Sequence, residues 1–332
     1  MIGRAPLKFR GNEALRAHLG VLHLASMEVI GQSRRGQDLF GITFGTGPRR
    51  VSIIAGSHAD EPVGPATAQA LPLILEESPL LEQYTFVVVP QINPDGADDN
   101  RAWFSEPPDL VRYAAGTVRE PPGDDIEFGF GEDGRPENLA AMDFLSEHAP
   151  FVAHFSLHGM AFAEGAWYLI CREWAGRTEE LRERLAARTA ALDMPLHDID
   201  RGGEKGFHRI APGFCTTPTS TGMKAFFEDD PEMAARFLPS SMEFVQSLGG
   251  DPLCMVSELP LFRIGKRSPS LEESVYWEVI DRFKLLRDTN GAGPEDIKAI
   301  ARDFDLEPVP IATQSALQVA MIEEALAVLP SA

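Results

Sequence analysis

Residues 51–64 read VSIIAGSHADEPVG and decide the fold. Residues 51–55 are apolar or small without interruption, which is typical of a strand buried on both faces of a parallel sheet. A glycine-serine turn ends that run, and it is followed by His58 and, three residues later, Glu61. In open α/β sheets, ligands bind at the carboxyl ends of the strands, so we expect both side chains to lie in such a crevice. An imidazole and a carboxylate at this spacing can bind one cation, and this donor pair suits zinc.

The composition is that of an ordinary globular protein, because 44% of the 332 residues are hydrophobic and 24% are charged. A formal net charge of −20 argues against nucleic acid or an anionic membrane as a partner, since both attract basic surfaces. The cysteines, Cys171, Cys215 and Cys254, are widely spaced and suggest neither a disulfide framework nor a structural zinc site. The sequence contains no signal-peptide pattern and no run of about 18 apolar residues. We therefore predict a cytoplasmic protein; the sequence does not reveal its oligomeric state.

Apolar patterns predict strands and helices that alternate along the first part of the chain. A helix over 11–26 precedes two strands, near 27–31 and 39–44, that form a hairpin at the edge of the sheet. A helix follows Glu61, and a second buried strand over 84–92 completes a parallel strand-helix-strand unit with residues 51–55.

The second part of the chain continues this alternation around two segments that are hard to interpret. Residues 105–135 are rich in Pro, Gly and acidic residues and predict a surface loop, whereas residues 195–245 allow no assignment. The other predicted elements are strands over 151–158, 166–171 and 253–262, and helices over 136–145, 178–192, 294–304 and 314–329, with one more that begins at 268.

These elements predict an α/β protein with a single doubly wound sheet, mixed but mostly parallel, with helices on both faces. No internal repeat and no clear linker divides the sequence, so we expect one catalytic domain over residues 1–332. Residues 1–26 and 290–332 are expected to be peripheral helical additions to that domain.

Two further strands end in side chains that suit the same cation. His158 follows the strand that begins at 151, and its alternative as a ligand is His154 on the same strand. Two imidazoles and one carboxylate give zinc three protein ligands and leave one position open for water, as in catalytic zinc sites. Glu258 stands between apolar residues in the strand over 253–262, where burial should raise its pKa. It is the candidate for the carboxylate that takes a proton from the water.

Several motifs in this order resemble the zinc metallocarboxypeptidase family of the carboxypeptidase A type. They are the segment IGQSRRG at 30–36, the ligand turn at 58–61, the sequence FSLH at 155–158, and NPDG at 93–96 followed by Asp98-x-Asn100-Arg101-x-Trp103. The resemblance covers roughly residues 28–160 and 250–262. It implies a zinc-carboxypeptidase-like fold and one Zn²⁺ per chain, bound by His58, Glu61 and His158.

The same resemblance implies roles for the residues that surround the zinc. Asp98 would accept a hydrogen bond from a ligand histidine, by analogy His58. Asn100 and Arg101 would bind a substrate carboxylate, because a guanidinium offers two parallel donors to a planar anion, and Arg101 counts with Glu258 among the catalytic residues.

The chain also departs from the family pattern. Only Ala97 separates NPDG from Asp98, so an arginine that polarises the scissile carbonyl in the family is missing from its usual place. Another alignment assigns residues 100–103 to that arginine segment and leaves 124–127 at the carboxylate clamp, where no arginine occurs. Arg112, Arg119 and Arg263 are the possible substitutes. No tyrosine lies between Tyr168 and Glu258 to match the family's mobile tyrosine, and His208 or Lys205 are candidates for its role.

We therefore predict a zinc-dependent metallocarboxypeptidase that hydrolyses the last peptide bond of a peptide with a water activated by Glu258. The alternative is a zinc-dependent deacylase of N-acyl amino acids, as in the aspartoacylase and succinylglutamate desuccinylase branch of the same superfamily. The substrate is therefore predicted to be a peptide for the first function or an N-acyl amino acid for the second. The pocket that selects the released residue should come from residues 195–257.

Overall fold

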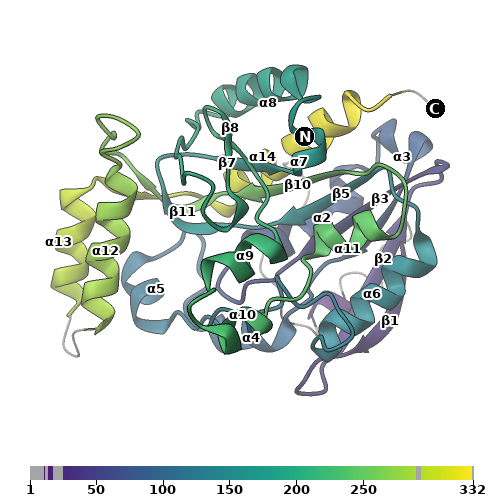
Figure 1. Cartoon of the computed structure of the whole chain (residues 1–332), viewed down its shortest axis with the longest axis horizontal. Coiled ribbons are helices and arrows are strands. Elements are labelled where there is room, and N and C mark those ends of the chain that lie inside the picture. The colour runs from purple at the N-terminus through teal and green to yellow at the C-terminus, as the bar shows by residue number, and fades with distance from the viewer. Residues whose placement is uncertain (1–10, 12–13, 18–24, 289–292, 331–332) are drawn as a thin grey trace.

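The computed structural model describes residues 11, 14–17, 25–288 and 293–330, and within them nine strands form one mixed sheet (Figure 1). Their order across the sheet is β1-β2-β4-β3-β5-β10-β7-β9-β8. Their bounds are β1 (Ala25–Gln32), β2 (Asp38–Phe44), β3 (Arg49–Ala55), β4 (Tyr84–Val89), β5 (Ala153–Leu157), β7 (Trp167–Ile170), β8 (Arg209–Ala211), β9 (Phe214–Thr216) and β10 (Leu253–Glu258).

The four strands at the centre of the sheet, β4, β3, β5 and β10, run parallel to one another. Antiparallel pairs flank this centre: β1 and β2 form the hairpin that the sequence predicts at one edge, and β10 pairs with β7 on the other side. Val51, Ile53 and Ile54 of β3 are fully buried, which confirms the prediction of a strand covered on both faces. The predicted doubly wound, mixed sheet is therefore confirmed.

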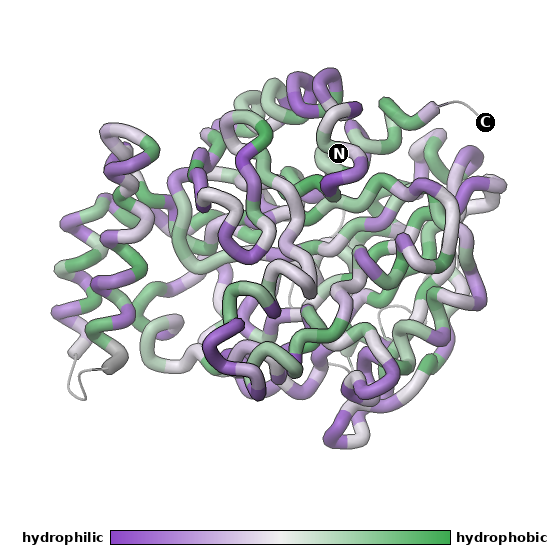
Figure 2. The backbone as a smooth tube through the Cα atoms, in the orientation of Figure 1, coloured by the Kyte–Doolittle hydropathy of each residue, from purple (hydrophilic) through white to green (hydrophobic). Residues whose placement is uncertain are grey.

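Helices cover both faces of this sheet. The main core joins Val51 and Ile53 to helices α2 (Val63–Ile74), α8 (Glu179–Ala191) and α14 (Ile311–Ala327) on one face. On the other face, Ile54 packs with α6 (Pro136–His148) and α11 (Ser241–Ser247). Alternate side chains of a strand point to opposite faces, so one continuous apolar run supplies both cores. Hydrophobic segments accordingly concentrate on the central strands (Figure 2).

The C-terminal helix α14 is an integral part of the main core, so the prediction of a peripheral addition over 290–332 is wrong for this helix. Leu317, Ala320 and Met321 are fully buried in the core that covers the sheet. The predicted addition over 1–26 lies largely outside the described residues. Helices α12 (Val275–Asp288) and α13 (Pro294–Asp303) pack together at one end of the molecule (Figure 1).

A small second sheet accompanies the main one, which the sequence does not predict. Within the described residues it has three strands, β6 (Met160–Ala163), β11 (Pro260–Ile264) and β12 (Leu306–Pro308), in the order β12-β11-β6. The strand predicted over 253–262 is therefore two strands, β10 and β11, which belong to different sheets. Glu258 lies at the junction between them.

The segment predicted as a surface loop, residues 105–135, is buried in part. Ile126 and Phe130 have exposed fractions of 0% and 2% and pack in the core with α6. The prediction is thus wrong for residues 126–130, which run through the interior near the sheet. The remaining short elements are α3 (Leu80–Gln83), α4 (Pro94–Asn100), α5 (Leu110–Gly116), α7 (Arg172–Ala175), η2 (Glu204–Gly206), α9 (Ser220–Phe226) and α10 (Pro231–Ala235).

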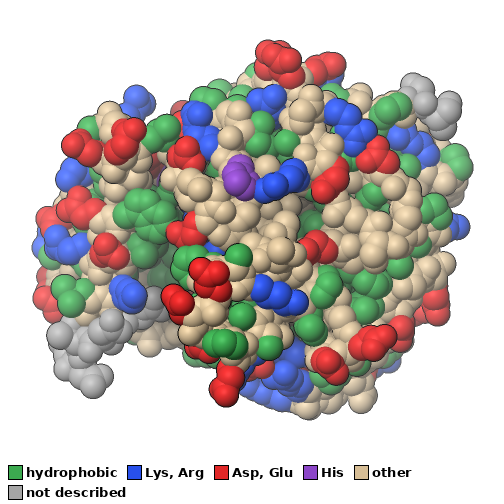
Figure 3. Space-filling model, in the orientation of Figure 1, with side chains coloured by type: hydrophobic (Ala, Val, Ile, Leu, Met, Phe, Trp, Pro, Cys, Tyr) green, Lys and Arg blue, Asp and Glu red, His purple; other side chains and the backbone are tan. Residues whose placement is uncertain are grey.

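Acidic and basic side chains are interspersed over the face of the molecule drawn in Figure 3. In the part of the chain that the structure describes, no helix has both the length and the apolar character needed to cross a bilayer.

Candidate metal centre

The turn after β3 brings His58 and Glu61 together. Gly56 begins this turn with a φ of +80°, a conformation that favours glycine. The backbone N–H of Glu61 then donates to the carbonyl of His58 over 3.3 Å, which closes the turn. As a result, Nδ1 of His58 lies 2.8 Å from Oε1 of Glu61.

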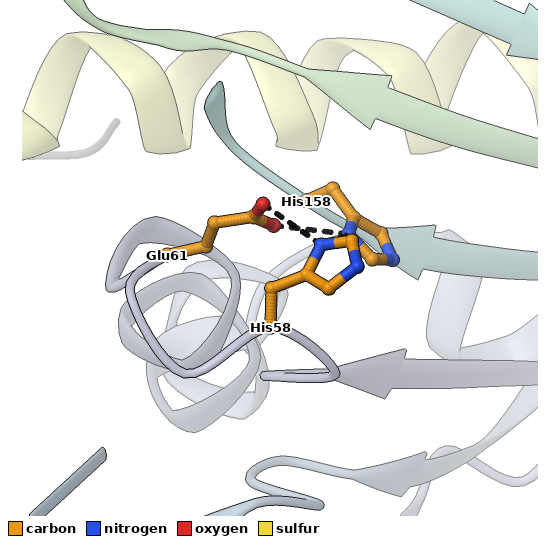
Figure 4. Close-up of side chains that lie close together, drawn as sticks. All are labelled: His58, Glu61 and His158. Atoms are coloured by element: carbon orange, nitrogen blue, oxygen red, sulfur yellow. Dashed lines mark hydrogen bonds and ion pairs between the residues drawn. The ribbon is translucent and has the colours of Figure 1, made fainter. Parts of the chain in front are cut away.

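His158 reaches the same point from the carboxyl end of β5, the neighbouring parallel strand. Its Nδ1 lies 2.9 Å from Oε2 of Glu61 and 3.1 Å from Nδ1 of His58. Figure 4 shows the three side chains pointing toward one another from two different strand ends. Among the described residues, these three form the group of His, Cys, Asp or Glu side chains that could hold one metal ion. Their ligand atoms all lie within 4.8 Å of one another.

This donor set fits a zinc ion. Two imidazole nitrogens and a carboxylate are ordinary zinc ligands, with bonds of about 2.0–2.2 Å and hence about 3.3 Å between donors in a tetrahedral site. The observed separations of 2.8, 2.9 and 3.1 Å fall short of that by only a few tenths of an ångström, so small side-chain rotations suffice. Three protein ligands leave a fourth position for water or substrate.

The backbone around His158 is fixed by close packing. A Cβ placed on Gly64 of α2 would lie 2.0 Å from the carbonyl oxygen of Leu157, so only glycine allows this approach. From the opposite side, Nε2 of Gln318 in α14 donates to the carbonyl of His158 over 3.1 Å and to Oγ of Ser257 over 3.0 Å. Helix α14 therefore supports the strand end that carries a candidate ligand.

His154, the alternative ligand, has other partners. Its ring nitrogens lie 2.9 Å from Oγ of Ser52 and 3.0 Å from Oγ of Ser241, and the side chain is fully buried. Burial lowers its pKa to about 3, so the ring stays neutral. His154 is thus a hydrogen-bonded core residue, while His158 lies in the ligand group.

Glu258 ends β10 beside the ligand strand. Ser257 pairs with Leu157 in the parallel register, so Glu258 and His158 follow at adjacent strand ends. Burial and the nearby carboxylate of Glu61 raise the pKa of Glu258 to about 8. The predicted upward shift is confirmed, and it suits a group that must both accept and release a proton near neutral pH.

Glu127 is a residue of this centre that the sequence motifs do not indicate. Its Oε2 lies 3.0 Å from Nε2 of His158, and Oγ of Ser156 lies 2.8 Å from the same nitrogen. Glu127 is 8% exposed and comes from the buried part of the segment after α5. The surrounding stretch is rich in Pro, Gly and acidic residues, so its composition does not indicate a buried carboxylate. The one signal in the sequence is that Glu127 lies between Ile126 and Phe128, an alternation typical of a buried strand.

Arg119, one of the three arginines considered as substitutes, also lies at this centre. Its Nη1 is 3.2 Å from Oε1 of Glu61 and 3.4 Å from Oδ1 of Asp60. The side chain is still 42% exposed, so its guanidinium can meet a substrate. Burial acts to lower the pKa of Arg119, but Asp60 and Glu61 outweigh it and raise that pKa, so the charge persists. Arg263 instead pairs with Glu307.

The prediction that Asn100 binds a substrate carboxylate is wrong. Asn100 is fully buried, and its amide donates to the carbonyls of Gly96 and Val118 and accepts from Trp103. Through these hydrogen bonds, the side chain of Asn100 holds α4 against the following loop.

Asp98 and Arg101 likewise have other partners than the metal centre. They pair with each other on the surface of the short helix α4 and its C-cap, with 38% and 54% of their side chains exposed. The predicted contact between Asp98 and His58 is absent, and Nε2 of His158 has Glu127 as its carboxylate partner instead.

Comparison with known proteins supports this chemistry. The model of the zinc carboxypeptidase family matches residues 22–169, a segment that contains His58, Glu61 and His158. No curated protein matches the chain. A solved metallo-carboxypeptidase from Burkholderia cenocepacia is 18% identical with a TM-score of 0.52, over 95% of this chain and 68% of its own. Carboxypeptidase A from Helicoverpa armigera is 14% identical with a TM-score of 0.52, over 99% of this chain and 76% of its own. At such identities these structures show a shared fold.

The fold, the His-Glu-His group and the family match together define a zinc metallohydrolase. The match of the zinc carboxypeptidase family model to residues 22–169 confirms the resemblance predicted from the sequence over this segment.

Proposed function

We propose that this protein is a zinc-dependent metallocarboxypeptidase that hydrolyses the C-terminal peptide bond of peptides. The observation that carries the proposal is the convergence of His58, Glu61 and His158 at two strand ends, with Glu258 at the adjacent strand end. This arrangement supplies three metal ligands and a separate carboxylate, which are the groups that hydrolysis of an amide requires. We further propose that residues 1–332 form one catalytic domain.

Zinc held by His58, Glu61 and His158 would act as a Lewis acid toward a carbonyl and lower the pKa of a bound water. Glu258 accepts a proton from the attacking water and transfers it to the nitrogen of the leaving residue, so the carboxylate is regenerated when the amine departs. Arg119 donates to the carbonyl oxygen of the scissile bond, where negative charge develops. Glu127 fixes the ring of His158, because its carboxylate accepts the Nε2–H and leaves Nδ1 free for the metal.

The alternative predicted from the sequence, a deacylase of N-acyl amino acids, receives no support from the family comparison, which names carboxypeptidases. The cytoplasmic location stays a prediction.

Assays of the zinc-loaded chain on two substrates test this function. They are an N-blocked dipeptide with a free carboxyl terminus and an N-acetyl amino acid, and the dipeptide assay is repeated after a zinc chelator is added to the enzyme. We expect release of the C-terminal amino acid from the dipeptide alone, with activity lost on chelation and restored by zinc. Faster turnover of the N-acetyl amino acid, or dipeptide hydrolysis that survives chelation, contradicts the proposal.

A further inference from the structure

Two cysteines that are far apart in the sequence lie opposite each other where β7 ends and β10 begins. The antiparallel register of these strands reaches the pair Ile170 and Met255. One step further, the backbone N–H of Cys171 donates to the carbonyl of Cys254 over 2.9 Å. Directly paired residues that share such a bond have Cα atoms about 5.5 Å apart, within the range of about 4.4–6.8 Å that disulfides span. The sheet therefore holds both residues at a separation that suits a disulfide.

The side chains of this pair face the same region. The carbonyl of Cys171 leaves the ladder and accepts from the backbone N–H of Trp174 over 3.0 Å, while Sγ of Cys171 lies 3.4 Å from the backbone nitrogen of Cys254. Both sulfurs are near the carbonyl oxygen of Pro252, at 4.0 Å for Cys171 and 3.7 Å for Cys254. The two thiols are thus gathered around one backbone oxygen.

The contact between the thiols makes the two sulfurs chemically unequal. A hydrogen bond from the thiol of Cys254 lowers the pKa of Cys171, whereas burial and the same contact raise the pKa of Cys254. Because the thiolate is the reactive form, Cys171 is the nucleophile and Cys254 keeps its proton. Cys215 differs from both, since burial raises its pKa to about 11 and its Sγ lies 3.7 Å from the carbonyl oxygen of Ile199.

The pair is buried, but it lies at the surface end of both strands. The exposed fractions of Cys171 and Cys254 are 2% and 0%. Arg172, the next residue along the chain, and Asp251, which precedes β10, are both exposed. Ends of elements open at a lower free energy than the centre of a core, and hydrogen peroxide is little larger than water. A local opening at this strand end is therefore sufficient to admit a small oxidant.

We propose that Cys171 and Cys254 are an oxidative modification site, at which a hydroperoxide converts the two thiols into a reversible disulfide that links β7 to β10. The thiolate of Cys171 attacks a peroxide oxygen, the O–O bond breaks, and hydroxide leaves a sulfenic acid on Cys171. The sulfur of Cys254 then attacks the sulfenic sulfur, the S–O bond breaks, and the hydroxyl leaves with the thiol proton as water. Two thiols are oxidised and one peroxide is reduced to two waters; a dithiol reverses the reaction by exchange.

This disulfide leaves the metal centre intact. Cys254 precedes Glu258 by four residues on β10, so the two positions are about 13 Å apart along the strand. The bond joins positions that are 83 residues apart in the sequence, which restricts the unfolded chain far more than the folded one. The oxidised protein should therefore keep its zinc and unfold at a midpoint at least about 3 °C higher than the reduced protein.

Peroxide treatment of the folded, zinc-loaded chain tests the inference, with alkylation during denaturation, thiol counting and peptide mapping by mass spectrometry. The reduced chain has three free cysteines, so the count should fall from three to one. The map should show the peptides of Cys171 and Cys254 cross-linked within one chain and Cys215 unmodified, and dithiothreitol should restore three thiols. Cys215→Ala is the matched control and should form the same cross-link.

Three thiols retained after peroxide treatment that oxidises exposed methionines overturn the inference, as do a cross-link through Cys215 and one between two chains. A cross-linked protein whose midpoint of thermal unfolding is unchanged or lower contradicts a disulfide compatible with the native sheet. Cys254→Ala, checked for folding by its circular dichroism, should accumulate a sulfenic acid on Cys171 that dimedone traps. Trapping at Cys215 instead contradicts the role of Cys171, and the wild-type map decides the question if the variant does not fold.

Discussion

Oε2 of Glu127 lies 3.0 Å from Nε2 of His158, on the side of the ring opposite the nitrogen that faces His58 and Glu61. A carboxylate in this position holds the proton of the histidine on the outer nitrogen and fixes the ring plane. Carboxylate partners of this kind tune metal affinity in many zinc sites. The relationship also explains why an acidic residue is buried in a segment whose composition resembles a surface loop.

Glu127→Gln should weaken zinc binding about 10- to 100-fold, because the neutral amide is a poorer acceptor for the Nε2–H of His158. Competition with a chromophoric zinc chelator measures this affinity directly. Glu132→Gln, an exposed residue of the same segment, is the control and should leave the affinity unchanged. An affinity equal to that of the wild type in Glu127→Gln would show that the contact has no effect on the metal.

Glu258→Gln should lower kcat about 10²- to 10⁴-fold, because the group that transfers the proton is lost while the metal ligands remain. Zinc content, measured on the same sample, should stay at the wild-type value. Glu307→Gln, whose side chain is 61% exposed, controls for the loss of a carboxylate elsewhere. Retention of wild-type kcat would remove Glu258 from the proposed mechanism.

Arg119→Gln should lower kcat about 10²- to 10³-fold, since a charged donor to the developing oxyanion is removed. Arg112→Gln on α5 is the matched control, because this exposed arginine belongs to the same region. A change in KM with an unaltered kcat would assign Arg119 to substrate binding instead of to the transition state.

Residues 51–61 predict both a buried parallel strand and half of the ligand group, because their local pattern determines both. Similar runs that end at His158 and Glu258 predict the other two strand ends at the centre, but they do not predict the order of the strands across the sheet. The sequence does not predict which loop residues reach the centre, since Glu127 and Arg119 are brought there by tertiary packing of a segment without a periodic pattern. For Asn100 the local motif predicts a role that the side chain does not have. The motif resembles a substrate clamp, but in this chain the side chain of Asn100 closes a buried turn.

The prediction of a peripheral addition over 290–332 is wrong for α14 because an apolar helix at a chain end resembles an appended element. Only the structure reveals that α14 covers the main sheet and that Gln318 holds the backbone of His158. An interior glutamine in such a helix indicates a specific buried partner, which the sequence alone cannot identify.

Two buried histidines should make the fold sensitive to acid. Burial lowers the pKa of His154 to about 3 and that of His197 to about 4, below the ordinary value of about 6.5. The unfolded chain therefore binds more protons below pH 6.5, and each histidine should cost about 1.4 kcal/mol of unfolding free energy per pH unit as the pH falls toward its folded pKa. Urea unfolding at pH 7.5, 6.0 and 5.0 measures this slope. In His154→Gln and in His197→Gln the slope should be reduced by about that amount, and a slope equal to the wild type would contradict the assignment.

Elemental analysis of the purified chain for zinc, with the wild type beside His158→Ala and His154→Gln, tests whether His58, Glu61 and His158 form a zinc site. We expect about one zinc per chain in the wild type and in His154→Gln, and a loss of zinc in His158→Ala, with thermal unfolding used to confirm that each variant is folded. A folded wild type that takes up no zinc after incubation with the metal, or a folded His158→Ala that retains a full equivalent, would contradict the proposed zinc site.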